Sequence, residues 1–231
     1  LISTLFVMIE ILIFLSGERA AFFFNTFAAI FVIIMIRDFK KVRFISLIVS
    51  FILITLITMV DNSAKKRIWD NTINQIGFKT DKINIFSEVH ESHYRSAYKM
   101  YLENKLIGIG VRNFRNFCHE TKFKESNDRS CTTHPHNTYV QFLAELGLVG
   151  FCFLAGLFLI FLYFCLKHLN GIVFKNKYYF NDFEICLLAA ILITIWPFVP
   201  TGNFFNNWIS IIYYYPVGFL LWSLNKKNSI K

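Results

Sequence analysis

The stretch His-Pro-His-Asn-Thr-Tyr, from His134 to Tyr139, holds the side chains best suited to chemistry and leads into an apolar segment. Proline is favoured at the first position of a helix, so the sequence predicts a helix whose first residue is Pro135, capped by Thr133 or His134. His136 then lies in the first turn. An imidazole accepts a proton near neutral pH, which makes His136 a candidate general base.

Small residues follow on the same predicted helix. Gly147 is eleven residues after His136, so the two fall within roughly 20° of one another around the axis. Gly150 extends this stripe, and small residues let a neighbouring helix approach closely in a membrane. We therefore expect His136 to face the interior of a helix bundle. The alternative is an interfacial histidine that only anchors the helix.

Arginines give a second set of candidates. Ser16-Gly17-Glu18-Arg19 interrupts apolar sequence, and an ionisable residue so close to a span favours function. A guanidinium grips phosphate through two hydrogen bonds, so Arg19 is a candidate phosphate ligand. An ion pair with Glu18, or a side chain that extends into the lipid headgroups, is the alternative.

Arg95 lies on a predicted Tyr-rich amphipathic helix that ends at Gly108-Ile109-Gly110, and Arg112 and Arg115 follow this turn. Such a helix suits a membrane interface. Glu91, four residues before Arg95, can pair with it on a solvated helix face. Taken together, arginines and a histidine beside aromatic side chains suit a lipid-linked pyrophosphate, with the histidine as base toward an incoming hydroxyl.

The elements that position these residues are apolar helices. Of the 231 residues, 55% are hydrophobic, above the roughly 45–50% usual for globular chains. Six apolar segments approach the length of a membrane span: 1–15, 21–36, 44–60, 139–166, 183–199 and 208–224. The predicted fold class is all-α, a polytopic transmembrane helix bundle of about six spans with a large, partly helical periplasmic loop. The chain opens inside an apolar run, and we expect it to be the C-terminal part of a longer protein.

Charge sets the expected orientation. The net charge is +9, and the short loops after the second, fourth and sixth segments are basic, which places them in the cytoplasm. The predicted organisation is three helices in 1–60, a periplasmic loop in 61–137, three helices in 138–224 and a cytoplasmic tail in 225–231. Basic residues on both sides of a membrane argue against nucleic acid as a partner. The expected location is the bacterial inner membrane, in contact with membrane lipids.

The cysteines allow one disulfide. Cys118 and Cys131 share the predicted outer loop, and an oxidising compartment permits a bond between them. The sequence leaves the bonded and the free state equally open. Three further cysteines lie in the apolar segments as small fillers.

Several of these residues resemble one family of bacterial membrane proteins. His136-Asn137, followed after nine residues by Gly147-Leu148-Val149-Gly150, is similar to the signature of the O-antigen ligase and polymerase family. Ser16–Arg19 resembles its Ser-x-x-Arg segment. Arg95 ahead of Gly108-Ile109-Gly110 and Phe114 resembles the arginine before its Gly-x-Gly…Phe pattern. Pro197–Trp208 is similar to the last outer loop of the family.

The resemblance implies a glycosyltransferase that moves a glycan from an undecaprenyl-pyrophosphate carrier to lipid A–core or to a growing polysaccharide, at the periplasmic face. His136 would activate the acceptor hydroxyl, while Arg19 and Arg95 hold the pyrophosphate. Substrate contacts are expected from Arg112, Asn137 and Tyr139. The reaction would invert the anomeric centre with no metal and no cofactor.

Two other functions compete. His90-x-x-His93 and His134-x-His136 could supply ligand pairs for zinc, although no compact Cys/His quartet is present. A transporter or flippase of lipid-linked sugars would carry charges in the middle of its spans, where this chain has few. Glu145 is one exception, and its position behind His136 makes it a candidate accessory acid.

Overall fold

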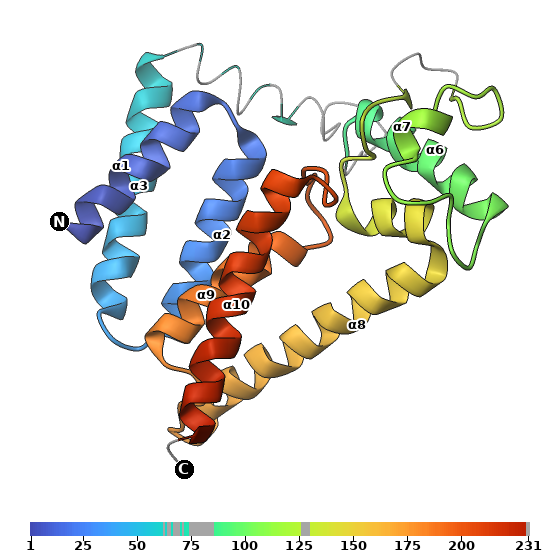
Figure 1. The fold of residues 1–231 in the computed structure, drawn as a ribbon. Helices are drawn as coiled ribbons and strands as arrows, with labels where there is room; N and C mark the ends of the chain where they lie inside the picture. Colours follow the sequence, from blue (N-terminus) through green and yellow to red (C-terminus); the bar gives the residue numbers. More distant parts are fainter. Residues whose placement is uncertain are drawn as a thin grey trace. The chain divides into compact units, whose positions relative to one another are not determined.

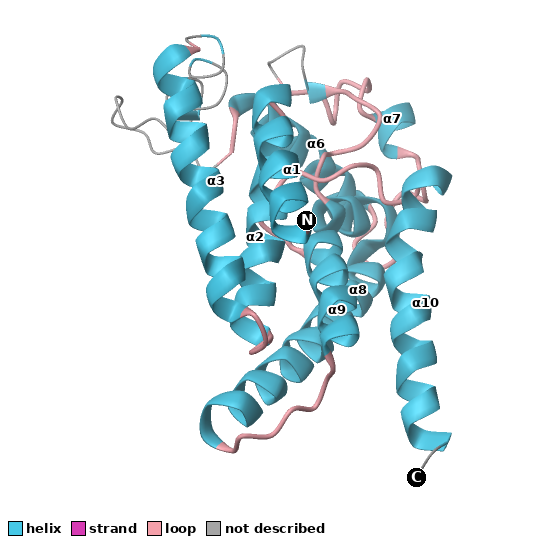
Figure 2. Ribbon diagram, turned by 90° about the vertical axis from the view of Figure 1, so that its left-hand side faces the viewer, coloured by secondary structure: helices cyan, strands magenta, loops and turns pink. Residues whose placement is uncertain are grey.

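The computed structural model describes residues 1–61, 63, 66, 70, 72–73, 86–125 and 130–229. In this part of the chain the regular elements are helices joined by loops (Figure 2), which confirms the predicted all-α class. The helices are α1 (Ile2–Ser16), α2 (Arg19–Met35), α3 (Lys40–Val60), α6 (Glu88–Glu103), α7 (Phe114–Phe117), α8 (Thr138–Phe174), α9 (Asp182–Ile195) and α10 (Asn207–Ser229).

Each of the six predicted apolar segments coincides with one helix. Among the described residues, α3 and α8 are long and apolar enough to cross a membrane, and α1 and α2 are shorter apolar helices. A helical membrane protein is consistent with this set. The number of spans and the sides of the loops stay predictions.

The chain forms two compact units. The first holds α1, α2, α3 and most of α9, and in it α1 packs on α2 and α3 (Figure 1). Phe14 and Ile54 are the buried centre of this packing. Gly17, with φ +78°, closes α1 through a 3.1 Å bond from its N–H to the Phe14 carbonyl, so that α2 starts directly afterwards at Arg19.

The second unit holds α6, α7, α8 and α10. Ser87 caps α6 by accepting the N–H of His90 at 3.3 Å, and Glu88 and Glu91 lie in the first turn, where the helix dipole favours negative charge. One face of α6 packs against α8. That face consists of Ser92, His93, Ser96, Ala97 and Met100.

Helix α8 is interrupted near its start. Gly147 has φ +66° and ψ −160°, a backbone conformation that only glycine adopts readily. Figure 1 shows the resulting bend between a short first section and the long section that follows. This break lies beside α6 and α7, where the candidate residues of the second unit gather.

Candidate active site

Helix α8 begins at Thr138, three residues later than predicted. The cap is Asn137, whose side-chain oxygen accepts the N–H groups of Tyr139 at 3.0 Å and Val140 at 3.1 Å. The prediction that Pro135 is the first helical residue, capped by Thr133 or His134, is wrong. An asparagine that satisfies two free N–H groups outweighs the helical preference of a proline two residues earlier.

His136 therefore lies ahead of the helix, in a bend of the chain. Its backbone has φ +59°, in the left-handed region. Since neither His136 nor Gly147 has helical geometry, the predicted alignment of the two on one helical stripe is also wrong. The orientation of His136 is set by its loop contacts instead.

The loop between α9 and α10 supplies these contacts. The N–H of Thr201 donates to the His136 carbonyl at 2.9 Å, and the Thr201 hydroxyl lies 2.9 Å from that of Thr138. The Thr201 carbonyl is 3.2 Å from Nε2 of His134. Asn137 adds a 2.7 Å bond from Nδ2 to the Pro197 carbonyl. The loop thus holds the backbone of His136 and its two neighbours in place.

Four histidines gather around this point. The ring centroid of His136 lies 4.1 Å from that of His134, 5.4 Å from that of His93 and 5.5 Å from that of His90. His90 and His93, one turn apart on α6, are 6.2 Å from one another. His93 and His134 are buried, and His136 is half-buried. We call these residues the histidine cluster.

Burial favours the uncharged form of two members of the cluster, His134 and His136. Desolvation lowers the pKa of His134 to about 4, with further lowering from the neighbouring His136, His93 and Arg115. The pKa of His136 is also below its ordinary value because the side chain is partly removed from water. A neutral imidazole can accept a proton, so His136 is in the form that a general base requires.

The loop from 105 to 110 forms hydrogen bonds with backbone groups on both sides of the break in α8. The N–H groups of Ile109 and Gly110 donate to the carbonyls of Ala144 and Glu145 at 3.0 and 2.9 Å. On the other side of the break, the N–H of Leu148 donates to the Lys105 carbonyl at 2.7 Å. Backbone groups that the bend leaves unpaired are thereby satisfied, as a helix inside a membrane protein requires.

Two glycines allow this contact. A Cβ on Gly108 would lie 2.6 Å from the Gly147 nitrogen, and a Cβ on Gly147 would lie 2.6 Å from the Gly108 nitrogen. Both have positive φ. The glycines of the predicted turn and of the predicted stripe therefore meet one another, backbone against backbone.

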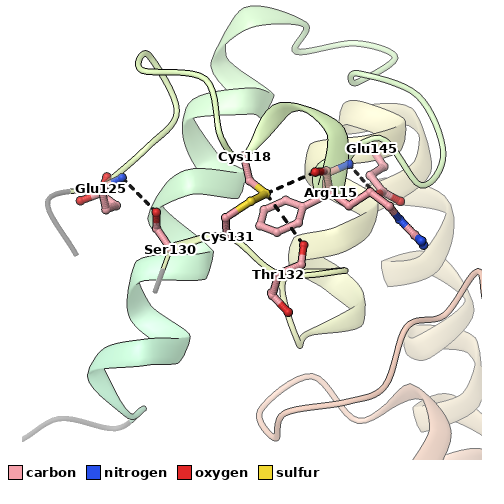
Figure 3. Close-up of a disulfide and its surroundings, with 8 residues drawn as sticks. Arg115, Cys118, Glu125, Ser130, Cys131, Thr132 and Glu145 are labelled. Carbon is pink, nitrogen blue, oxygen red and sulfur yellow. Dashed lines mark hydrogen bonds between the residues drawn. A yellow bond between two sulfur atoms is a disulfide. The ribbon is translucent and has the colours of Figure 1, made fainter. Parts of the chain in front are cut away.

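Glu145 lies at the junction between the break in α8 and the loop that follows the glycine turn. Its side chain is fully buried, and the carboxylate accepts the N–H groups of Arg112 at 3.0 Å and Phe114 at 3.1 Å, together with Nε2 of Gln141 at 3.1 Å. Figure 3 shows Glu145 beside Arg115. These bonds give Glu145 a structural role in fixing the loop after the glycine turn. Its role as an accessory acid stays a prediction.

Two of the expected substrate-binding residues have partners in the protein. Arg112 donates to the Phe205 carbonyl through Nε, at 2.8 Å, and through Nη2, and Nη2 also donates to Asn207 Oδ1 at 2.9 Å. The Tyr139 hydroxyl donates to the Ile195 carbonyl at 2.8 Å. Both residues, like Asn137, tie the start of α8 and its neighbouring loop to the segment between α9 and α10.

Arg95 has a partner on its own helix, and Arg19 belongs to the first unit. The Arg95 side chain is 68% exposed and lies 3.6 Å from Glu91, as the alternative assignment had it. It follows His93 by two residues, which places it about 200° around α6 from the cluster side. Arg19 belongs to the first unit, where its Nη1 donates to the Thr72 hydroxyl at 3.3 Å.

The structure pairs Cys118 with Cys131, which decides between the two states that the sequence left open. Figure 3 shows this bond next to Arg115 and Thr132. The ligand atoms of Cys118, His119 and Cys131 lie within 4.8 Å of one another, the one such group in the described part of the chain. Sulfurs bonded to each other offer no thiolate, so this group does not fit a metal ion in the oxidised protein.

Sequence reasoning missed part of the site. His90 and His93 were expected only as a possible ligand pair, although their spacing of one helical turn does place both on one face. Arg115 had no assigned role, yet its charge acts on His134. Thr201 carried no signal of its own beyond its place in the Pro197–Trp208 segment.

Comparisons with known proteins gave one match. The family model described as O-antigen ligase matches residues 4–155, which include α1 to α7 and the first half of α8. No curated protein and no solved structure matched the chain.

Proposed function

The chain belongs to the O-antigen ligase family, and on this premise we propose that it transfers a glycan from an undecaprenyl-pyrophosphate carrier to an acceptor hydroxyl at the periplasmic face of the inner membrane. Members of this family are inner-membrane proteins of the glycosyltransferase type. The acceptor is a sugar of lipid A–core in a ligase, or the end of another polysaccharide in a polymerase.

The observation that carries the proposal is the setting of His136. Its half-buried, uncharged imidazole is fixed by the Thr201 bond to its own carbonyl and by contact with three other histidines. A base held in this way loses little entropy on meeting the hydroxyl. His136 also opens the His-Asn…Gly-x-x-Gly signature by which the chain resembles the family.

The proposed step is a direct displacement at the anomeric carbon. His136 removes the proton of the acceptor hydroxyl while the oxygen attacks the anomeric carbon of the glycan. The bond from this carbon to the pyrophosphate oxygen breaks, and undecaprenyl pyrophosphate leaves with the electron pair. Attack from the face opposite to the leaving group inverts the anomeric centre.

Arginines would stabilise the leaving group. Negative charge grows on the pyrophosphate as the bond breaks, and fixed guanidinium groups lower the free energy of that charge in the transition state. We assign this role to Arg19 and Arg95, with Arg112 at the substrate. We add Arg115, because its charge is felt at His134 in the cluster. Asn137 and Tyr139 would act on substrate binding by positioning the start of α8.

The proposed location follows from the family and from the helices. Six membrane spans, with 61–137 in the periplasm and 225–231 in the cytoplasm, would bring the cluster to the outer surface, where lipid-linked glycans are exposed. A transporter of such lipids without catalysis is the second candidate. The family match favours the enzyme.

A reconstituted reaction tests the proposal. The protein, expressed from its complete gene and purified into liposomes, would receive undecaprenyl-pyrophosphate-linked glycan and, in separate samples, lipid A–core or a second lipid-linked glycan. We expect transfer to one acceptor in the presence of EDTA, detected as a gel shift of the product. Movement of the donor across the bilayer, with neither acceptor elongated, would contradict the enzyme and support the transporter.

A further inference from the structure

We propose that His90, His93 and His136 together bind a divalent transition-metal ion, with Zn²⁺ as the reference ion. Imidazole nitrogens are preferred ligands of zinc, and three protein ligands with one open position are a common arrangement. The proposed site shares only His136 with the proposed reaction. The metal is a ligand that regulates the enzyme and has no part in the transfer itself.

The separations of the three rings are close to those around one ion, although their nitrogen atoms are not gathered as the ligand atoms of Cys118, His119 and Cys131 are. Three imidazoles on a tetrahedral zinc, with Zn–N of about 2.0–2.1 Å, hold their ring centroids roughly 5 Å apart. The observed centroid separations are 5.4, 5.5 and 6.2 Å. Because the χ2 torsion of histidine has a broad minimum, each ring can turn to present a nitrogen to the ion without moving its backbone.

The backbones that carry the three rings are well supported. His90 and His93 lie one turn apart on α6, which packs against α8. His136 is held by Thr201 from the next loop. Ligands on a helix and on a hydrogen-bonded loop keep their backbone positions when the metal leaves, so binding requires only that the rings turn.

Outer contacts already orient the ligands. Nδ1 of His90 lies 2.9 Å from the Ser87 hydroxyl, so Nε2 is the nitrogen that we assign to the ion. Histidine ligands of metals generally have their second nitrogen hydrogen-bonded in this manner. His134 is the neighbour that does not bind, because its nitrogens lie 3.0 Å from the Thr133 hydroxyl and 3.2 Å from the Thr201 carbonyl.

Occupation of the site would stop the proposed reaction, and this consequence rests on the proposed function. A nitrogen of His136 that is bonded to a metal ion has no lone pair for the acceptor proton. Binding of zinc would therefore inhibit transfer, and a chelator would restore it.

Metal binding is tested without any assay of activity. Purified protein in detergent, stripped with EDTA and freed of chelator, would be titrated with Co²⁺ and Zn²⁺, with visible absorption of Co²⁺ and bound zinc per protein as readouts. We expect one equivalent. Even the loss of an outer contact weakens such sites about 10–100-fold, so His90→Gln and His136→Gln should each weaken zinc binding at least about tenfold.

His119→Gln is the matched control, since His119 is an exposed histidine of the same loop region outside the cluster. Unchanged zinc binding in His90→Gln and His136→Gln would overturn the site, provided both variants keep the wild-type melting temperature. No bound metal in the wild type would overturn it as well, and would leave the proposed function untouched.

Inhibition is measured separately in the liposome reaction. We expect stoichiometric zinc to abolish transfer in the wild type and in His119→Gln, and His90→Gln to need at least about ten times more zinc for the same fractional inhibition. Zinc that binds through His136 without slowing transfer would contradict His136 as the base. The metal site would then stand while the proposed function fails.

Discussion

At the level of single residues, the backbone of His136 is the most informative feature. A residue other than glycine in the left-handed region costs about 1–3 kcal/mol and persists only when its surroundings fix it. Here the bond from Thr201 and the cap at Asn137 do so. Histidine is enriched at positive φ, but such residues are still uncommon there. The sequence therefore placed His136 in a helix that starts two residues after it.

Asn137 is the residue on which this turn depends. Replacement by alanine removes the cap of α8 and the bond to Pro197, so Asn137→Ala should lower the stability of the protein by about 1–3 kcal/mol. Thermal unfolding in detergent measures the loss. Asn116→Ala is the control, because the Asn116 amide is exposed and bonds only its neighbour Asn113. Equal melting temperatures for the two variants would refute the role of the cap.

Glu145 allows a charge-sensitive test of the junction at the α8 break. In the wild type the two carboxylate oxygens of Glu145 accept two backbone N–H groups. Glutamine has a similar size but only one acceptor oxygen. In Glu145→Gln the side-chain NH₂ group would therefore face one of these N–H groups and leave it without an acceptor. The expected cost is about 1–3 kcal/mol. Glu103→Gln, in an exposed pair with Lys122, should change stability by less than about 1 kcal/mol. The same denaturation curve for both variants would argue against a structural role for the Glu145 carboxyl group.

At the level of elements, hydrophobic segments predicted each of the six apolar helices, because long apolar runs leave a membrane chain few other structures. The break in α8 was not predictable in the same way. Gly147 and Gly150 read as small residues for helix packing. Gly147 instead bends the helix so that the turn at Gly108 can hydrogen-bond across the gap, a contact between segments almost forty residues apart.

Alanine substitutions at two glycines of α8 distinguish the backbone role of Gly147 from a role in helix packing. Gly147→Ala should cost at least about 3 kcal/mol, because an alanine is strained at this φ and ψ and its Cβ meets the backbone of Gly108. Gly156→Ala meets no atom within 4 Å and should be neutral or slightly stabilising. Membrane levels and melting temperatures of the two variants measure the difference. A tolerated Gly147→Ala would show that the break is not required.

At the level of the whole molecule, the parts of the site were predictable and their assembly was only partly so. Histidine pairs, arginines and the loop near Pro197 all stand out in the sequence. The meeting of the histidines with this loop depends on α6 packing on α8 and on contacts of the α9–α10 loop, all of them between distant segments. Arg19 belongs to the other unit, so its role as a phosphate ligand remains a proposal.

The disulfide tests which side of the membrane the large loop occupies. If the loop is periplasmic, Cys118 and Cys131 should be oxidised in cells, which a maleimide gel shift with and without reductant detects once Cys152, Cys165 and Cys186 are replaced by alanine. Loss of the bond should cost about 3 kcal/mol for a loop of this length. Reduced thiols in untreated cells would contradict the predicted orientation.

The central claim is that His136 is the base of a glycan transfer. The most direct measurement is surface glycan in bacteria that lack their own O-antigen ligase or polymerase and carry the complete gene, as wild type, His136→Ala or His119→Ala, at matched membrane levels. We expect one strain to regain its glycan with wild type and with His119→Ala, and at least about a hundredfold less product with His136→Ala. Wild-type glycan from His136→Ala would contradict the claim.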